Sequence, residues 1–290
     1  MKRVIFSADD FGLDPAVNDA VEIAHRDGVL AAASLMVGED AAPAAVEIAR
    51  RNPHLRVGLH VALVEATPVS DPALIPDLVD DNGRFPGDMV AAGFRFFFKP
   101  GVRAQLALEI RAQFEAFHRT GLALDHANTH KHIHLHPTVA RLIVEIGRDY
   151  GLKAVRLPVE PAGPVAAAEG GPAAGGLGAA ALRAWTGQLK AMLKRQGIAT
   201  NDQVFGLAWS GAMTEARIAG LIPHLPDGVS EIYFHPATRL SSKLAATMPT
   251  YRHADELAAL VSPEVKRLVA AHGVTRTSFT ELAAAERRAA

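Results

Sequence analysis

Short apolar runs alternate with helical patterns along the first part of the chain, and this alternation limits the fold more than any other feature. Residues 3–8, 30–37 and 55–63 each read as a buried strand, because a brief apolar run ends at polar residues. Residues 15–26 and 41–50 space their apolar side chains three or four positions apart, as an amphipathic helix does. This repeated order predicts a parallel sheet with helices outside it.

The remainder of the chain continues this order around two irregular stretches. Residues 66–101 hold five Pro and four Gly between short apolar pieces, which predicts an excursion from the sheet. Residues 161–178 are almost all Ala, Gly and Pro, which predicts a flexible loop. Further helices are expected at 104–119, 138–150 and 180–195, and further strands at 122–127, 154–157, 204–208, 231–234 and 275–279.

About seven of these strand candidates are secure, and together they favour a single α/β domain over residues 1–290. The favoured architecture is an irregular, TIM-like (β/α) barrel of parallel strands. An open, doubly wound sheet is the alternative fold.

Composition excludes several kinds of site. The chain has no Cys, so disulfides, Cys nucleophiles and thiolate metal ligands are absent, and any metal must be bound by His, Asp, Glu, carbonyls or water. A net charge of -1 argues against a nucleic-acid partner. Because no stretch resembles a signal peptide or a spanning helix, we expect a cytoplasmic protein.

Polar side chains follow three of the predicted strands. Asp9 and Asp10 end the first strand, His60 lies late in the third, and residues 125–137 hold five of the 13 His. Adjacent Asp residues also cap helices, and a lone strand His is commonly a core residue. The functional interpretation therefore depends on all three features lying at the ends of predicted strands. In parallel α/β folds the carboxyl ends of strands face the active site. A carboxylate with two or more His predicts a site for zinc, non-haem iron, manganese or magnesium.

The His cluster and the Asp pair each raise a question of orientation. His130, His132, His134 and His136 alternate, so a strand would place all four imidazoles on one face, at the mouth of the barrel. Adjacent strand residues point to opposite faces, so only one Asp faces a metal squarely unless the strand end turns the second inward. One carboxylate could then bind the metal while the other accepts a proton from metal-bound water.

Two further strand ends carry functional candidates. His235 precedes Pro236 after the strand at 231–234, where it could act as a general acid. Arg156 ends the strand at 154–157, where it either binds substrate or forms a structural ion pair.

Four motifs, in this order, resemble the YdjC-like carbohydrate deacetylases over essentially the whole chain. They are residues 7–13 (SADDFGL), 58–60 (GLH), 130–134 (HKHIH) and 235–236 (HP). Residues 75–80 and 92–98 are similar to the hopanoid-biosynthesis-associated branch of that family. The chain departs from the family at Thr129, since family members often have Ser before the ligand His.

The resemblance implies a polysaccharide-deacetylase-like barrel that binds a divalent metal, magnesium or zinc. It places the metal ligands on Asp10, His60 and His130, the proton-accepting carboxylate on Asp9 and the general acid on His235. The branch implies removal of an N-acetyl group from a glucosamine carried on a hopanoid lipid. The alternatives are a deacetylase of soluble chito-oligosaccharides, a metal phosphoesterase or iron oxygenase with the same ligands, and a non-catalytic binding protein.

Five further residues are candidate substrate contacts, namely Asn128, His132, Arg156, Phe96 and Phe97. Both Phe residues belong to the run at 94–98, which has basic neighbours. This run forms either a buried element or an apolar, basic-edged surface that receives a lipid tail. The expected partners are therefore an acetylated, lipid-linked amino sugar and, peripherally, the inner membrane face, with a homodimer as a further expectation.

Overall fold

The strands form one parallel sheet with β1 at its centre. The computed structural model describes residues 1–171 and 177–289, and within them the strand order is β4-β3-β2-β1-β6-β5, with β7 also paired to β1. The strands are β1 (Lys2–Phe11), β2 (Ala32–Leu35), β3 (Arg56–Val61), β4 (Leu124–Thr129), β5 (Gln203–Phe205), β6 (Gly228–Phe234) and β7 (Thr275–Arg276). β1 is buried from Val4 to Phe11, as a parallel strand covered on both faces should be. The predicted α/β fold with about seven parallel strands is confirmed.

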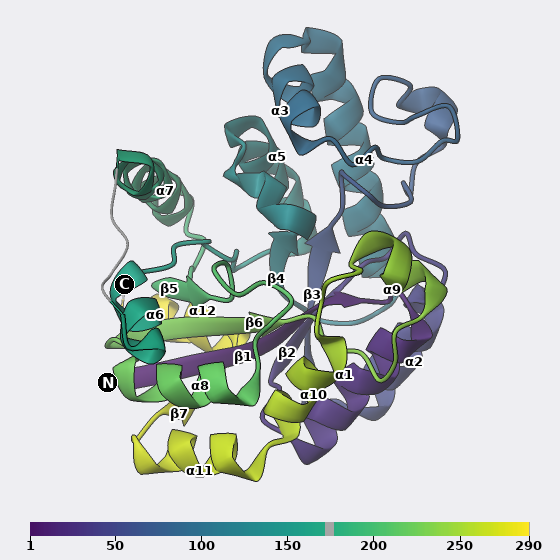
Figure 1. Ribbon diagram of the computed structural model, residues 1–290. Coiled ribbons are helices and arrows are strands. Elements are labelled where there is room, and N and C mark those ends of the chain that lie inside the picture. Colours follow the sequence, from purple (N-terminus) through teal and green to yellow (C-terminus); the bar gives the residue numbers. More distant parts are fainter. Residues whose placement is uncertain (172–176, 290) are drawn as a thin grey trace.

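Helices surround this sheet (Figure 1). The α-helices are α1 (Pro15–Asp27), α2 (Ala42–Arg51), α3 (Met89–Phe98), α4 (Pro100–Arg119), α5 (Pro137–Gly147), α6 (Ala162–Glu169), α7 (Leu177–Arg195), α8 (Glu215–Leu221), α9 (Ser242–Thr247), α10 (His253–Val261), α11 (Pro263–Ala271) and α12 (Phe279–Ala289). Short 3₁₀ helices are η1 (Pro72–Leu74), η2 (His130–Leu135), η3 (Arg148–Tyr150) and η4 (Ile222–His224). Local chemistry sets the start of α1, where Asp14 accepts the Ala16 N–H at 2.8 Å and Pro15 occupies the first turn.

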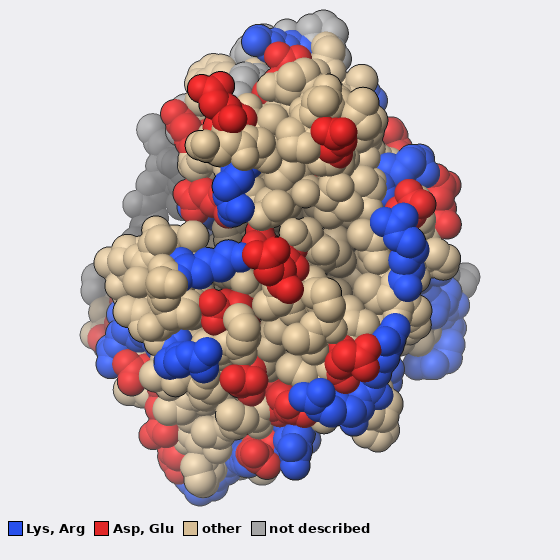
Figure 2. Space-filling view, turned by 90° about the vertical axis from the view of Figure 1, so that its right-hand side faces the viewer, with Lys and Arg blue, Asp and Glu red and all other residues tan. Residues whose placement is uncertain are grey.

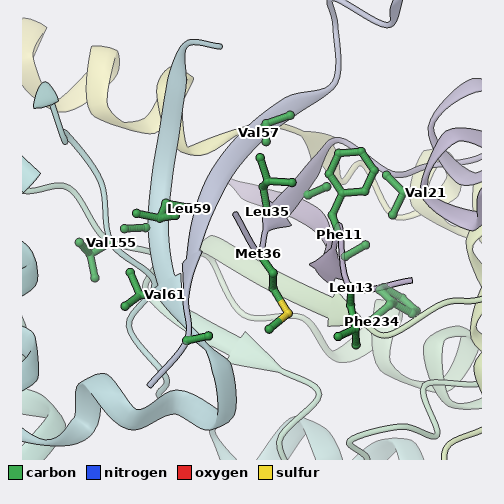
Figure 3. Close-up of a cluster of buried hydrophobic side chains, with 14 of the residues drawn as sticks. Phe11, Leu13, Val21, Leu35, Met36, Val57, Leu59, Val61, Val155 and Phe234 are labelled. Carbon is green, nitrogen blue, oxygen red and sulfur yellow. The ribbon is translucent and has the colours of Figure 1, made fainter. Parts of the chain in front are cut away.

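Alternation along the strands separates an outer core from a barrel interior. Outward-facing side chains such as Phe11 and Leu35 pack with Val21 of α1 in the cluster drawn in Figure 3. Inward-facing Ile5 belongs to a second apolar cluster, which includes Phe279 of α12. Because these inward positions lie near the amino ends of their strands, α12 closes that end of the barrel.

Beyond this second apolar cluster, the barrel interior is polar. The buried side chains there are Ser7, Ser34, His126, Arg156 and Glu231, followed toward the carboxyl ends by Asp9, His60 and Asn128. Burying so many polar groups costs free energy unless each finds a hydrogen-bond partner. The interior therefore leads from α12 to the end of the sheet where the predicted site residues lie.

Irregular chain spans the gap between β4 and β5. Ala154 and Val155 form only isolated bridges, to Ala199 and Ala127 respectively. The prediction of a regular strand over 154–157 is therefore wrong. Side-chain hydrogen bonds replace the missing backbone bonds between strands here. The Asn201 amide accepts from the Leu157 N–H at 2.7 Å and donates to the Leu157 C=O at 2.8 Å.

Two other predicted segments differ from the structure. The loop predicted over 161–178 contains helix α6, which packs against α8, and residues 172–176 lie outside the described part. The strand predicted over 275–279 ends at Arg276, because Phe279 begins α12. The irregular residues 66–101 include η1 and α3, and α3 projects with the start of α4 beyond the end of the sheet (Figure 1).

The surface carries both signs of charge in mixture. Figure 2 shows Lys and Arg interspersed with Asp and Glu over the visible face, with uncharged areas between them. The whole chain has 30 Lys and Arg against 31 Asp and Glu, so neither sign dominates.

Candidate metal centre

The end of β1 brings two adjacent carboxylates to one site. Asp9 and Asp10 are both buried, and the register between β1 and β2 shifts between Ala8 and Phe11. Asp10 has a φ of 62°, in the left-handed region that Asp adopts more readily than most residues. The strand end therefore turns the side chain of Asp10 inward instead of to the opposite face, which was one of the two alternatives open from the sequence.

Asp10, His60 and His130 form a cluster of potential metal ligands. One donor atom from each residue lies within 4.8 Å of the others. Asp10 Oδ1 is 3.0 Å from His130 Nδ1 and 3.3 Å from His60 Nε2. The cluster thus joins β1, β3 and the first residue of η2, and it brings together the three residues on which the family resemblance places the metal ligands.

Hydrogen bonds around His60 show that the cluster suits a cation. Asn128 Nδ2 lies 3.0 Å from Asp9 Oδ1, and since a carboxylate only accepts, the amide nitrogen faces Asp9. Asn128 Oδ1 is then the atom 2.7 Å from His60 Nδ1, which must carry the imidazole proton. In its neutral form, His60 therefore points the lone pair of Nε2 at Asp10. Both His60 Nε2 and Asp10 Oδ2 are buried without a hydrogen-bond partner among the described residues, as ligand atoms for a metal would be.

The electrostatics of the cluster also favour positive charge. Burial lowers the pKa of His60, but the carboxylates of Asp9 and Asp10 outweigh burial and raise it above its usual value. Burial raises the pKa of Asp10, but the neighbouring His130 and His60 outweigh burial and hold it well below its usual range. The centre therefore keeps an anionic ligand in place and attracts a cation.

Asp9 is held by a buried Arg. The Arg156 guanidinium donates to Asp9 Oδ2 at 2.5 Å and to Oδ1 at 2.9 Å, and it also donates to Glu231 at 2.7 and 2.8 Å. Burial raises the pKa of Asp9, but Arg156 outweighs burial and holds the pKa far below its usual range. Asp9 is therefore an oriented anion on the pocket wall.

Two predicted substrate contacts are corrected by these bonds. Arg156 is fully buried with its donors directed at Asp9, Glu231 and Ser7, so it is a structural ion pair and does not touch substrate. Asn128 is 1% exposed and bonds His60, Asp9 and Ser34, so it positions site residues instead of binding substrate. Both residues lie beneath the pocket, and neither lines it.

His235 lies on the same pocket after the end of β6. Burial lowers the pKa of its imidazole in spite of the nearby Asp10 and Asp9. Its backbone is fixed on both sides, since the His235 N–H donates to the Glu256 carboxylate and the His235 C=O lies 2.6 Å from His253 Nδ1. Burial raises the pKa of Glu256 to about 7.

The pocket has a volume of about 360 Å³ and an aromatic wall. His132 lies there with Nε2 3.2 Å from the Tyr233 hydroxyl, so its predicted contact with substrate stays a prediction. The Tyr251 ring packs edge-to-face on His235 at 5.1 Å and its hydroxyl lies 3.0 Å from Ser210. The segment 247–251 before α10, which includes Tyr251, also lines the pocket.

The His cluster does not share one face. Residues 130–135 form η2, with Lys131 and His132 at φ of 53°, so the strand alternation assumed from sequence is wrong. His134 is buried against Thr129 Oγ1 and the Arg156 C=O, at 2.6 and 2.9 Å. His136 meets Phe96 edge-to-face at 6.0 Å, away from the pocket lining.

The Phe run is part of α3. Phe96 is 3% exposed and belongs to the hydrophobic core, so its predicted contact with substrate is wrong. The side chain of Phe97 lies outside the described residues. Phe94 is 63% exposed on the same helix.

The chain is similar to known proteins over most of its length. A sequence model of the YdjC-like protein family matches residues 3–271. The chain belongs to the YdjC-like family. No helix in the described part of this YdjC-like chain is both long and apolar enough to cross a membrane.

Named relatives in this family span almost the whole chain. A carbohydrate deacetylase from Geobacillus stearothermophilus is 28% identical over 280 residues, covering 96% of this chain and 96% of the relative. A carbohydrate deacetylase from Vibrio parahaemolyticus is 25% identical over 288 residues, covering 97% and 96%. A crystal structure from Enterococcus faecalis, described in terms of cellobiose-phosphate cleavage, has 24% identity, a TM-score of 0.76 and coverage of 97% and 98%, and it supports the fold.

Several residues of the site had no signal in the sequence. Glu231 and Glu256 lie in ordinary strand and helix patterns, and only the fold shows that they meet Arg156 and His235. Tyr251 follows a turn-rich stretch that resembles any surface loop. Their partners are far away along the chain, so local spacing could not pair them.

Proposed function

We propose that this protein is a metal-dependent hydrolase that removes the N-acetyl group from an N-acetylglucosamine-type sugar. The observation that carries the proposal is the meeting of Asp10, His60 and His130 at one pocket with Asp9 and His235. Full-length relatives named as carbohydrate deacetylases support the reaction class.

The donor set of one carboxylate and two imidazoles suits a divalent ion, magnesium or zinc, bound by Asp10, His60 and His130. Such an ion supplies Lewis acidity to the amide carbonyl and lowers the pKa of water. The chain's own residues then supply positioning and proton transfer.

Asp9 is the proton acceptor in this proposal. Arg156 and Asn128 use three of its four lone-pair positions, which leaves one on Oδ2 for the attacking water. Because its pKa is held low, Asp9 is ionised at any physiological pH, and it accepts a proton readily only from an acidified water.

His235 is the proton donor to the leaving amine. Water adds to the carbonyl carbon, the C–N bond breaks, and the nitrogen takes a proton from His235, giving acetate and a free amino sugar. The His235 Nδ1 is buried with no hydrogen-bond partner among the described residues, so the imidazole is held chiefly through its backbone and by the Tyr233 and Tyr251 rings.

For the substrate, we propose a glucosamine carried on a hopanoid lipid, with the protein in the cytoplasm, peripheral to the inner membrane face and acting as a homodimer. The motif similarity at residues 75–80 and 92–98 supports the lipid-linked sugar, and exposed Phe94 supplies an apolar side chain on projecting α3. The test is acetate release from N-acetylglucosaminyl hopanoid and from diacetylchitobiose, each with and without chelator. Preference for chitobiose would refute the lipid assignment, and no release from either would refute the deacetylase.

A further inference from the structure

A row of three residues crosses the barrel interior beneath the metal centre. Ser34 on β2 is paired with Gly58 on β3, and His126 on β4 lies beside Gly58, since Leu59 pairs with Ala127. A Cβ on Gly58 would lie 2.4 Å from the His126 imidazole. The missing side chain at Gly58 therefore lets His126 reach across the middle strand to Ser34.

This crossing completes a chain of buried hydrogen bonds. His126 Nδ1 lies 2.9 Å from Asp125 Oδ2, and His126 Nε2 lies 3.1 Å from Ser34 Oγ. Ser34 Oγ is in turn 2.9 Å from Asn128 Nδ2. Asp125 is 2% exposed, and both His126 and Ser34 are fully buried. None of these three takes part in the reaction proposed above.

The donors along this chain point in one direction. Asn128 Nδ2 must donate to Asp9, so the same nitrogen donates its second proton to Ser34 Oγ. The Ser34 hydroxyl proton is then free for His126 Nε2, which accepts it. In the neutral form of His126, the proton consequently lies on Nδ1 and is donated to Asp125, whose other oxygen accepts from Thr280.

We propose that Asp125, His126 and Ser34 form a positioning relay that, together with Asp9, fixes the amide of Asn128 and thereby presents His60 Nε2 to the metal centre. A flipped Asn128 would turn its oxygen toward Ser34, whose only proton His126 already accepts. The flipped amide would also donate to His60 Nδ1, and this would move the imidazole proton to the metal-facing Nε2. The relay excludes that state together with the Asp9 carboxylate, which would also face the flipped oxygen, as groups behind metal-bound His commonly do.

The proposal of a relay rests on the metal site of the proposed function. It also makes a separate prediction, namely which nitrogen of His60 carries the imidazole proton. A merely structural polar cluster would stabilise the fold without affecting which nitrogen of His60 carries the proton. An apolar interior would serve a structural purpose at least as well. The two roles are therefore separable by measuring His60 and metal affinity alongside stability.

The test compares Ser34→Ala and His126→Phe with a matched control, Ser230→Ala. Ser230 is also a buried strand hydroxyl and accepts from the Gln203 amide at 3.0 Å, but it has no bond to the relay. We expect both relay variants to weaken Zn²⁺ binding about 10- to 100-fold, as for other groups behind metal ligands, and the control to bind as the wild type does. Equal affinity in all four proteins, or an equal loss in the control, would overturn the relay.

A second measurement needs neither metal nor substrate. Nitrogen-15 NMR of metal-free protein, at a pH where His60 is neutral, should show its proton on Nδ1 in the wild type and in Ser230→Ala. In His126→Phe, whose ring can keep the stacking on Phe279, the signal should shift toward the Nε2–H form. A wild-type Nε2–H form, or no change in the variant, would overturn the relay even if the protein binds no metal.

Discussion

Replacing Arg156 with Met should convert the buried ion pair beneath the site into two unpaired carboxylates. Arg156 and Glu231 are fully buried and the side chain of Asp9 is only 4% exposed, so neither carboxylate can find a substitute partner in solvent. Breaking a buried pair by removing one partner costs about 3–5 kcal/mol. For a chain of this size, a loss of about 4 kcal/mol lowers Tm by roughly 10 °C.

The loss should depend on pH with a defined sign. In the wild type the pKa of Asp9 is depressed on folding, so its contribution is present above pH 3.8 and is lost only as the pH falls below that value. In the variant, burial without Arg156 raises the carboxyl pKa, so the destabilisation grows as pH rises and shrinks on acidification. The difference in unfolding free energy between variant and wild type should therefore be larger at pH 8 than at pH 5.

Urea unfolding of metal-free protein at the two pH values measures this difference. Arg217→Met is the matched control, because Arg217 is a partly exposed Arg that bonds one carbonyl and stacks on Trp209. A loss below about 1 kcal/mol for Arg156→Met at pH 8, within the range of an exposed pair, or a loss equal at both pH values, would refute the reasoning.

Three shorter predictions follow from the same network. Asp9→Asn should lower kcat by about 10²- to 10⁴-fold while Zn²⁺ affinity measured by calorimetry stays near the wild-type value, and normal turnover would show that Asp9 is not the proton acceptor. Folding raises the pKa of Glu256 from 4.5 to about 7, so the stability that protonated Glu256 contributes is fully present below pH 4.5 and is lost as the pH rises toward 7. Denaturation curves measured across this pH range should show the loss, and Glu256→Gln should make it smaller. Gly58→Ala should cost about 1–3 kcal/mol by thermal unfolding, because its Cβ would meet His126 at 2.4 Å, whereas Gly163→Ala, which meets nothing within 4 Å, should not destabilise.

The sequence was informative where the chemistry is local. The buried run before Asp9 and Asp10 predicted β1, and the polar residues that follow the strands predicted which side chains would gather at the carboxyl edge. Parallel strands bring such positions together whatever the detailed geometry, and the resemblance to the YdjC-like family selected Asp10, His60 and His130 among them before the fold was known.

The sequence was misleading, or left alternatives open, where a backbone conformation or a distant partner decides where a side chain lies. Periodicity gives no warning of the left-handed turn at His132, and this turn separates the imidazoles that a strand would align. For Arg156 the sequence leaves a substrate contact and a structural ion pair open, and only Glu231, 75 residues further along, shows that the guanidinium is paired. For Phe96 the sequence leaves a buried element and a lipid-facing surface open, and only the packing of α3 shows that the side chain is buried.

The central claim is that Asp10, His60 and His130 bind one metal ion on which acetate release depends. The most direct measurement is a titration of metal-free protein with Zn²⁺, following bound metal and acetate release from diacetylchitobiose and N-acetylglucosaminyl hopanoid together. The account predicts that activity rises with occupancy of about one ion per chain, and that Asp10→Asn loses most of both. Undiminished acetate release from metal-free protein, or full activity in Asp10→Asn, would contradict it.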